Sequence, residues 1–494
     1  MSRWIAAAFV ALMILGAALR APHLAERPLH NDEGVNAIKF RDLYVTHDYK
    51  YDPNEFHGPT LPYFTLAAAW LNGAGDYNGF TESFFRAVPV VFGVGLIGLV
   101  ALLGAALGWG RTLWAALFTA LSPAFVFYSR DYIHETLLTF FAALTFIAAW
   151  RYAQTRRWAW AVVGGLALGL MAATKETFVF ALAAMAAAVF CSRLRRKPES
   201  PTLWPGAVAA LGIAAVVAGL LFTSFFANPA GLADAARAYL PWLHRAGGAT
   251  PHTHPWYFYL ARLKFEALLG LLAIVGLAAA RSPLEKIIGY YTLFLTAIYA
   301  VLPYKTPWCL LGFWHGAILL AGIGAGAIWE RKSWRWLAAP VLGAISLQLA
   351  GSAWWVNFGQ AHGAPESSAP SNPYVYAQTS PDIIRLVDTI NGIAQASPEK
   401  FGAVLEVVSP ESYWPLPWYL RRFERVGFWE QMPDQPLAPI MVVAANLGAA
   451  LDERPGRTHL MAGYFKLRPD VFMELYVRID LWTRYVQAGS RPAE

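Results

Sequence analysis

Charged residues are scarce in this chain. Only 14% of its 494 residues are Asp, Glu, Lys or Arg, whereas 57% are hydrophobic. A typical soluble domain carries about 25% charged residues. Cysteine is rarer still, because Cys191 and Cys309 are the only two and lie far apart in the sequence. The cysteines therefore provide neither a disulfide framework nor a cysteine metal cluster.

Aromatic residues, by contrast, are abundant: the chain has 21 Trp, 22 Tyr and 30 Phe. This composition suits a protein with two membrane interfaces, where Trp and Tyr anchor helices. The formal net charge of +7 does not indicate nucleic-acid binding, because the basic residues fall in short clusters between apolar runs. The composition predicts a polytopic integral membrane protein that binds membrane lipid and no nucleic acid.

Apolar runs recur along the first 356 residues. A helix needs roughly 17 to 25 apolar residues to cross a bilayer, and on this basis we predict about eleven spans. They cover residues 4–19, 85–107, 112–128, 133–150, 158–173, 178–191, 204–226, 265–280, 287–302, 309–329 and 334–354. We interpret the first as an uncleaved helix rather than a signal peptide, since many spans follow. The run 61–71 is too short to span and predicts an interfacial or re-entrant helix.

Short basic linkers between the spans indicate the orientation. These linkers hold Arg111; Arg151, Arg156 and Arg157; Arg193, Arg195, Arg196 and Lys197; Arg281 and Lys286; and Arg331, Lys332 and Arg335. All of them fall on one side of the membrane if the N-terminus is cytoplasmic. We therefore expect a multi-pass protein of the plasma (inner) membrane. Nearly every unusual polar residue, including the loop 22–84, is then extracytoplasmic.

The tail differs in kind from the rest of the chain. It begins with a segment rich in Ser and Pro at residues 364–370. Its expected elements are a helix over 381–394, capped by Ser380, and strands at 403–408 and 440–445. We expect an all-α transmembrane domain over residues 1–356 and a small extracytoplasmic α/β domain over residues 363–494.

Two adjacent acids, Asp32 and Glu33, lie in the first outer loop within a His-Asn-Asp-Glu-Gly segment. They open a predicted helix over residues 33–45. One carboxylate there can take a proton from an acceptor hydroxyl, while the other orients it or holds a cation. Asp is also a favoured N-cap residue, so the residue types alone favour a capping role for Asp32 equally.

A second motif, His57-Gly58-Pro59, follows in the same loop. The Gly-Pro pair predicts a turn that starts the short helix. His57 at this turn can bind a phosphate or assist a carboxylate. A histidine that merely caps an interfacial helix is the more common case for such a residue.

Charged residues also stand at the outer ends of the spans. Arg86 opens the second span, Arg130 and Asp131 end the third, and Lys175 and Glu176 end the fifth. Charges at membrane depth are costly and are usually functional. Lys175 is suited to binding a phosphate. A salt bridge from Arg130 to a loop acid, or an interfacial pair of Lys175 with Glu176, is the structural alternative.

Metal-like patterns are weak in this sequence. His134 and Glu135 begin like a zinc-protease motif, but its second histidine is missing. Glu135 nevertheless lies within an apolar span and needs a partner. His252 and His254 have metal-like spacing, yet two histidines alone are weak evidence. Asp32, Glu33 and His57 offer oxygen and nitrogen ligands suited to a divalent ion, but their spacing does not require one.

The order of these motifs resembles that of the dolichyl-phosphate-mannose–protein mannosyltransferase superfamily, whose members are GT-C membrane glycosyltransferases that use polyprenyl-phosphate sugars. More narrowly, the Asp32-Glu33 pair, His57-Gly58-Pro59 and Arg86 with Arg130 resemble a branch named for association with flippase activity in archaeal protein glycosylation. Bacterial members of this branch exist. The tail segment 413–421 (YWPLPWYLR) resembles it too. The resemblance covers the first six or seven spans.

This resemblance implies a GT-C fold and roles for individual residues. Asp32 is implied as the catalytic base toward the acceptor, with Glu33 in support. Arg86, Arg130 and Lys175 are implied as residues that hold the donor phosphate. Cationic side chains that stabilise a phosphate leaving group, together with one base, are sufficient chemistry for the transfer.

Three functional hypotheses follow. The first is an inverting glycosyltransferase that moves a sugar from a polyprenyl-phosphate donor to a glycan, lipid or protein acceptor. The second is a non-catalytic partner of a lipid-linked-glycan flippase or assembly system. The third, an ion-coupled transporter, fits less well, because transporters place charges near the middle of the membrane and here the acids gather at one face.

Overall fold

The computed structural model describes residues 2–54, 57–73, 75–193, 203–240, 252–361, 364–365, 368–369, 371–434 and 437–489. The basic linker residues Arg195, Arg196 and Lys197 and three residues of the Ser- and Pro-rich segment, 366, 367 and 370, lie outside this description. The chain divides into two compact units. The first consists of Met1–Leu24, Asp42–Ala74 and Ser83–Tyr376, and the second of Ala25–Arg41, Gly75–Glu82 and Ala377–Glu494.

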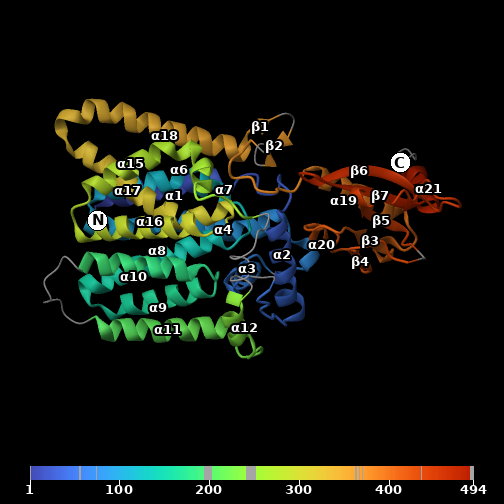
Figure 1. Ribbon diagram of the computed structural model, residues 1–494, viewed down its shortest axis with the longest axis horizontal. Helices are drawn as coiled ribbons and strands as arrows, with labels where there is room; N and C mark the ends of the chain where they lie inside the picture. The colour runs from blue at the N-terminus through green and yellow to red at the C-terminus, as the bar shows by residue number, and fades with distance from the viewer. Residues whose placement is uncertain are drawn as a thin grey trace. The chain divides into compact units, whose positions relative to one another are not determined.

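The first unit is a bundle of helices that lie roughly parallel or antiparallel (Figure 1). Its helices are α1 (Arg3–Arg20), α3 (Thr60–Leu71), α4 (Glu82–Val100), α5 (Gly104–Leu107), α6 (Trp109–Leu121), α7 (Pro123–Tyr128), α8 (Glu135–Thr155), α9 (Trp158–Ala172), α10 (Phe178–Arg193), α11 (Trp204–Phe222), α12 (Gly231–Arg237), α14 (Phe258–Arg262), α15 (Ala267–Ala279), α16 (Pro283–Val301), α17 (Leu310–Glu330) and α18 (Arg335–Phe358). Short one-turn helices join several of them, including η1 (Asp42–Thr46), η3 (Ala101–Leu103), η4 (Lys264–Glu266), η5 (Pro307–Cys309) and η6 (Lys332–Trp334). A two-stranded ribbon, β1 (Gln360–Ala361) and β2 (Ala364–Pro365), follows α18.

Within the described residues, seven helices are long and apolar enough to cross a membrane. They are Arg3–Arg20, Glu82–Leu107, Glu135–Thr155, Trp204–Phe222, Pro283–Val301, Pro307–Glu330 and Lys332–Phe358. The shorter apolar helices include α3, α9 and α10. A helix therefore occupies each segment that the sequence predicts as a span, while the number of membrane crossings stays a prediction.

One predicted span is wrong as a continuous helix. The run 112–128 is divided into α6 and α7 at Ser122 and Pro123. Proline has no backbone N–H to continue the ladder of the preceding helix, but it suits the first position of a new one. The Ser122 hydroxyl caps this second helix by accepting from the amide of Phe125. The break turns a set of polar backbone groups toward the interior of the bundle.

The first unit is organised around α17. Of the residues in its apolar stretch, 83% are buried, which is a larger share than in the other six long helices. It packs against α6, α15 and α16, and the glycines along it allow close approach: a Cβ on Gly324 would lie 2.3 Å from the carbonyl oxygen of Leu272 on α15. On another side of the bundle, α9 packs against both α8 and α11.

A buried carboxylate joins three parts of this core. Glu266 is 0% exposed. Its Oε2 accepts hydrogen bonds from the Ser122 hydroxyl at 2.6 Å and the Trp314 indole at 2.7 Å. Its Oε1 accepts from the Ala124 amide at 2.9 Å and the Tyr374 hydroxyl at 3.0 Å. Four donors thus replace water around one charge and tie the break between α6 and α7 to α17 and to the segment around Tyr374.

The second unit is a small α/β domain. Its strands are β3 (Leu405–Val408), β4 (Val426–Trp429), β5 (Ile440–Ala444), β6 (His459–Arg468) and β7 (Val471–Arg478), in the order β4-β3-β5-β7-β6. β4, β3 and β5 are parallel, whereas β7 runs antiparallel to both β5 and β6. Helices α19 (Asp382–Ala396) and α21 (Ile479–Gly489) pack together and contact β6 and β7, so they cover one face of the sheet.

The predicted elements of the tail are confirmed: the helix over 381–394 is α19, and the two predicted strands are β3 and β5. The same unit includes two segments of the first loop. One carries α2 (Asn31–Arg41) and the other a short turn at Tyr77–Gly79. The predicted helix over 33–45 is therefore observed as α2, followed by the π-helix η1.

The four hydrogen-bond donors around Glu266 lead to a first prediction. In Glu266→Gln, one oxygen still accepts, but the new amide NH₂ faces donors that the carboxylate satisfied. We expect a loss of on the order of 3 kcal/mol in the free energy of unfolding, measured as a lower melting temperature in detergent. Glu330→Gln is the control, because Glu330 is mostly exposed and pairs with Arg111. Equal melting of the two variants would contradict a structural role for Glu266.

Candidate functional site

The first turn of α2 is fixed by reciprocal hydrogen bonds around His30. Glu33 is 0% exposed, and its Oε2 accepts from the amide of His30 at 2.7 Å. In return, the His30 Nδ1 accepts from the amide of Asp32 at 3.2 Å. This arrangement resembles a capping box, in which the side chain of the residue before the helix accepts from an amide of the first turn, and a side chain of that turn accepts from the amide of the residue before the helix. Glu33 therefore holds the start of the helix that carries Asp32.

Asp32 itself remains available for chemistry. The N-cap interpretation of Asp32 is wrong, because the side chain that meets a free amide at this helix start belongs to His30. Asp32 is half-buried, and among the described residues its carboxylate is contacted by the side-chain amide of Asn31 at 3.2 Å. One oxygen is thus oriented while the carboxylate stays accessible, as a general base requires.

The tail clamps α2 within the second unit. The Tyr419 hydroxyl accepts from the amide of Leu29 at 3.0 Å, and the Thr379 hydroxyl donates to the Leu29 carbonyl at 2.7 Å. The helix packs on α20 (Leu416–Tyr419). Gly34 makes this approach possible, since a Cβ there would lie 2.6 Å from the Cβ of Pro415. The tail segment 413–421 therefore scaffolds the helix that carries Asp32.

A separate group of candidate residues lies in the first unit, at the end of the bundle where α7, α9 and α16 finish and α8, α10 and α17 begin. We call this the polar end. The turn at His57 is docked there: the Gly58 amide donates to the Thr174 carbonyl at 3.1 Å, and the Thr60 amide donates to the Ala173 carbonyl at 3.0 Å. A Cβ on Gly58 would lie 2.1 Å from the Ala173 oxygen, so only glycine fits.

This docking brings His57 to Glu176. The His57 Nδ1 lies 2.9 Å from Glu176 Oε2, and the Tyr51 hydroxyl donates to Glu176 Oε1 at 2.9 Å. Burial alone would raise the pKa of Glu176, but the attraction and hydrogen bond of His57 outweigh it and lower this pKa to about 2. Burial, followed by the neighbouring Glu176 charge, raises the pKa of Tyr51 above its usual value. Glu176 is therefore an anion that orients His57.

Lys175 forms a buried ion pair with Glu135. Both side chains are 5% exposed. The prediction that Glu135 needs a partner is confirmed, because Lys175 is that partner. Lys175 therefore pairs with Glu135 and not with its neighbour Glu176. Removing one member of a buried pair leaves an uncompensated charge, which typically costs about 3–5 kcal/mol.

His134 lies beside this group. Its Nε2 is 3.1 Å from the Gly58 carbonyl, and its ring meets that of His57 edge to face at 5.3 Å. Burial, together with the positive charges of His57 and Lys175, lowers the pKa of His134 well below its usual value. The ring is therefore neutral and donates its Nε2 proton to the carbonyl, which leaves a buried Nδ1 that has no hydrogen-bond partner among the described residues.

The two candidate arginines meet backbone carbonyls. Arg86 is 1% exposed and donates to the Leu24 carbonyl at 2.6 Å. Arg130 donates to the carbonyls of Arg20 and Pro22 at 2.8 and 2.6 Å, and its guanidinium lies over the ring of Phe358. Both arginines hold the connector that follows α1. Asp131, next to Arg130, is buried. A phosphate-binding role for the arginines stays a prediction.

His252 and His254 converge on one hydroxyl. The His252 Nδ1 and the His254 Nε2 lie 2.7 and 3.2 Å from the Tyr376 oxygen. Within the described ranges, no group of three or more His, Cys, Asp or Glu side chains has the geometry of a metal site. A divalent ion at Asp32, Glu33 and His57 stays a prediction.

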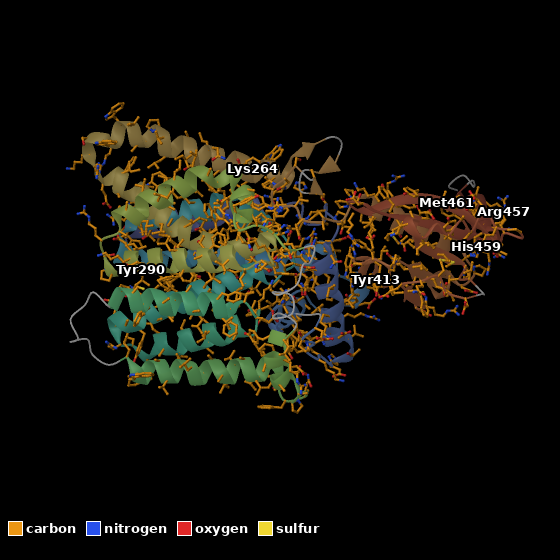
Figure 2. The ribbon with its side chains drawn as sticks, in the orientation of Figure 1. Lys264, Tyr290, Tyr413, Arg457, His459 and Met461 are labelled. Carbon is orange, nitrogen blue, oxygen red and sulfur yellow. The ribbon has the colours of Figure 1, made fainter. Side chains whose placement is uncertain are left out.

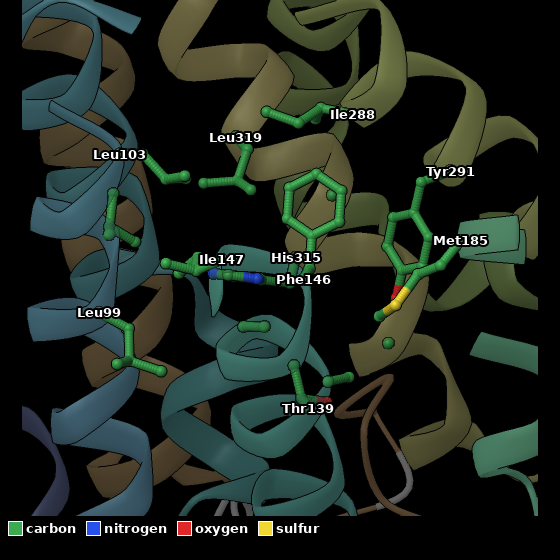
Figure 3. Close-up of a pocket in the computed structure, with 15 residues that line it drawn as sticks. Leu99, Leu103, Thr139, Phe146, Ile147, Met185, Ile288, Tyr291, His315 and Leu319 are labelled. Carbon is green, nitrogen blue, oxygen red and sulfur yellow. The ribbon is translucent and has the colours of Figure 1, made fainter. Parts of the chain in front are cut away.

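An apolar cavity of ≈ 30 Å³ lies elsewhere, inside the bundle between α4, α8, α10, α16 and α17 (Figure 3). Leu103, Ile147 and Leu319 are among its walls, and none of the candidate residues lines it. His315 points into it, with its Nε2 buried and unpartnered among the described residues. Its volume is enough for about two water molecules, so it is too small for a sugar.

Sequence reasoning missed Tyr51, Glu266 and the structural role of His30. Tyr51 has no motif around it, and its partner Glu176 is 125 residues away. Glu266 could have been found from the sequence, because it is an acid at the edge of an apolar run, which is the same signal that marked Glu135. His30 was part of the motif but was passed over for the acids beside it.

Comparison with known proteins supports this fold. Residues 57–219 match the family model described as dolichyl-phosphate-mannose-protein mannosyltransferase. This stretch contains the candidate residues of the polar end but neither Asp32 nor Glu33. None of the curated proteins matches the chain in sequence.

Solved structures cover nearly the whole chain. ArnT from Cupriavidus metallidurans bound to undecaprenyl phosphate is 13% identical with a TM-score of 0.66, over 95% of this chain and 98% of that one. The oligosaccharyltransferase AglB from Archaeoglobus fulgidus, in complex with an inhibitory peptide and a dolichol-phosphate, is 15% identical with a TM-score of 0.57, over 86% and 64%. The arabinofuranosyltransferase AftD from Mycobacteria is 14% identical with a TM-score of 0.54, over 97% and 40%.

These likenesses establish the fold that the sequence predicts. The chain is a multi-pass membrane protein with the GT-C fold and a small C-terminal α/β domain. At such low identity the likeness concerns the fold, and the chemistry has to be argued from the residues of this chain.

The His57–Glu176 contact gives a second prediction. Because the pKa of Glu176 is lowered in the folded protein, its carboxylate stabilises the fold above a pH of about 4.5, and this contribution is lost as the pH falls toward about 2. We expect Glu176→Gln to lower the free energy of unfolding at pH 7 by at most on the order of 3 kcal/mol. The difference in melting temperature between the two proteins should be the same at pH 7 and pH 5 and smaller at pH 3.5, and an unchanged difference at pH 3.5 would contradict the assignment.

Proposed function

We propose that the protein transfers a sugar from a polyprenyl-phosphate donor to an acceptor hydroxyl, with Asp32 as the general base. The observation that carries this proposal is the state of Asp32. Its helix is fixed by Glu33 and His30, one of its oxygens is oriented by Asn31, and its carboxylate is half-buried and free of any cation among the described residues. A carboxylate held in this way can remove a proton without losing an ion pair.

The reaction balances as an inverting displacement. The acceptor oxygen attacks the anomeric carbon from the side opposite the phosphate, and a new C–O bond forms there. The bond between the anomeric carbon and the phosphate oxygen breaks, and its electron pair leaves with the phosphate. Asp32 takes the proton of the acceptor hydroxyl. The phosphate is already a good leaving group, so the protein has to stabilise its charge and orient the acceptor.

For the donor phosphate we propose the polar end. His57 has the most accessible side chain of the group, 37% exposed. Glu176 faces its Nδ1, which leaves Nε2 as the donor toward a phosphate, as in other carboxylate-oriented histidines. Lys175, whose ammonium group is paired with Glu135, is assigned to the same role. Arg86, Arg130 and Asp131 are assigned to the same substrate-binding role, the arginines through the connector that they hold.

We also propose that the polar end faces outward from the plasma (inner) membrane, with the N-terminus in the cytoplasm. The distribution of Lys and Arg over the short linkers supports this orientation. The donor then presents its head group at the outer interface while its isoprenoid tail stays in the lipid. A non-catalytic partner of a lipid-linked-glycan flippase is the alternative, and it would bind the same donor without transfer.

Substitution of Asp32 tests the proposed base. Asp32→Asn keeps the shape and the contact with Asn31 but removes the proton acceptor, so we expect transfer to fall about 100-fold or more. The measurement is sugar release from a polyprenyl-phosphate donor in reconstituted vesicles. Asp48→Asn, an exposed acid of the same loop paired with Lys50, is the control. Undiminished transfer by Asp32→Asn would refute the assignment, and no transfer by the wild type with any donor would favour the non-catalytic partner.

Substitution of His57 tests donor binding separately. Loss of a charged hydrogen bond to phosphate should weaken binding of undecaprenyl phosphate about 10-fold or more in His57→Gln. Glu176→Gln should weaken it less, because His57 remains but loses its orientation. Tyr239→Phe is the control, since Tyr239 contacts only the backbone carbonyl of Glu176. Titration of undecaprenyl phosphate into the purified protein gives the affinities, and equal values for His57→Gln and the control would contradict the proposal.

A further inference from the structure

Three aromatic side chains lie next to the helix that carries Asp32. The rings of Tyr413 and Phe428 stack with centroids 4.7 Å apart and an interplanar angle of 30°. The ring of Trp414 is centred 6.4 Å from that of Tyr413 and is tilted by 31° against it. All three residues are partly exposed, and Figure 2 labels Tyr413. We call this set the aromatic row.

The aromatic row is anchored to α2 on both sides of Asp32. Before Asp32, the Asn31 side-chain oxygen accepts from the Ser412 hydroxyl at 2.8 Å. After Asp32, Gly34 lies against Trp414, because a Cβ on Gly34 would be 3.4 Å from the Trp414 Cε3. Ser412 and Trp414 therefore lie beside the turn of α2 that carries Asp32.

The charges around the aromatic row are unsuited to an anionic acceptor. The guanidinium of Arg468 donates to the carbonyl oxygens of Ser412 and Trp414 and holds the turn, and the neighbouring carboxylate of Glu411 offsets its charge. Glu411 is exposed immediately before Ser412, and Asp32 adds a second carboxylate. Two carboxylates repel an anion, whereas they accept hydrogen bonds from neutral hydroxyl groups.

We propose that the aromatic row is an acceptor subsite for a neutral saccharide. The apolar C–H faces of a pyranose ring stack on aromatic rings, and its hydroxyl groups find acceptors in Asp32, Glu411 and the Asn31–Ser412 pair. This inference rests on the proposed function, because it names the acceptor of the reaction in which Asp32 is the base. It narrows the acceptor class from a glycan, lipid or protein to a neutral carbohydrate chain, free or lipid-linked.

The test is direct binding of saccharides to the full-length protein in detergent, without donor. The probes are neutral hexasaccharides of glucose, mannose and N-acetylglucosamine, with hexagalacturonate as an anionic counterpart. Saturation-transfer NMR gives the dissociation constants. We expect the wild type to bind at least one neutral hexasaccharide and to bind hexagalacturonate less tightly. Binding of none of the neutral probes, or preference for the anion, would overturn the proposal.

Aromatic-to-leucine variants locate the site. Tyr413→Leu and Phe428→Leu keep apolar bulk against their neighbours but remove the ring faces, and each should raise the dissociation constant roughly tenfold. Trp429→Ala is the matched control: Trp429 is an exposed aromatic on the same strand, and successive side chains of a strand point to opposite faces. Equal affinities for Tyr413→Leu and Trp429→Ala would overturn the proposal.

Asp32→Asn separates this inference from the proposed function. This variant should still bind the saccharide, with a smaller rise in the dissociation constant than Tyr413→Leu, because the asparagine side chain still accepts a hydrogen bond. If Asp32→Asn transferred sugar normally while Tyr413→Leu lost saccharide binding, the base assignment would fail and the acceptor subsite would stand. If Asp32→Asn stopped transfer while Tyr413→Leu bound saccharide undiminished, the proposed function would stand and the subsite would fall.

Discussion

The polar end of the bundle depends on one place where no side chain fits. Gly58 and Thr60 donate backbone hydrogen bonds to the turn at Ala173 and Thr174, and the Ala173 oxygen occupies the position that a Cβ on Gly58 would take. This backbone contact sets the distance between the first loop and the junction of α9 with α10. The contact of His57 with Glu176 and that of His134 with the Gly58 carbonyl follow from it. The side-chain chemistry here is thus a consequence of backbone docking.

Buried charge in the first unit is accommodated in different ways, and the difference separates structural from functional groups. Glu266 is surrounded by four donors, while Arg130 is surrounded by backbone carbonyls and an aromatic face. Glu266 is thus satisfied within the fold by hydrogen-bond donors alone. Lys175 instead uses the counter-ion Glu135. Asp32, in the second unit, has none of these arrangements, and this distinguishes it from the other acids that the fold has buried.

Much of the architecture was predictable because it depends on local pattern. Apolar runs predicted the helices, and the helix at 381–394 and the strands at 403–408 and 440–445 were read correctly. The break before Pro123 was also legible, since a proline in a helical run ends or starts a helix. The hairpin of β6 and β7 was missed because its residues do not alternate regularly between polar and apolar: β6 contains the run Leu-Met-Ala-Gly-Tyr-Phe and β7 begins with Val-Phe-Met. Pairings such as Tyr51 with Glu176 were out of reach, because nothing local signals a contact across 125 residues.

The second unit is built from three segments that lie far apart in the sequence, so it can assemble only after the last of them has been synthesised. The hydrogen bond between Leu29 and Tyr419 joins residues 390 positions apart. At translation rates of roughly 5 to 20 residues per second, the chain from Leu29 to Tyr419 takes roughly 20 to 80 s to synthesise. During that interval α2 lacks the surface on which it packs, so the helix that carries Asp32 is completed only near the end of synthesis. A chain that terminates before Tyr419 therefore lacks the surface on which α2 packs.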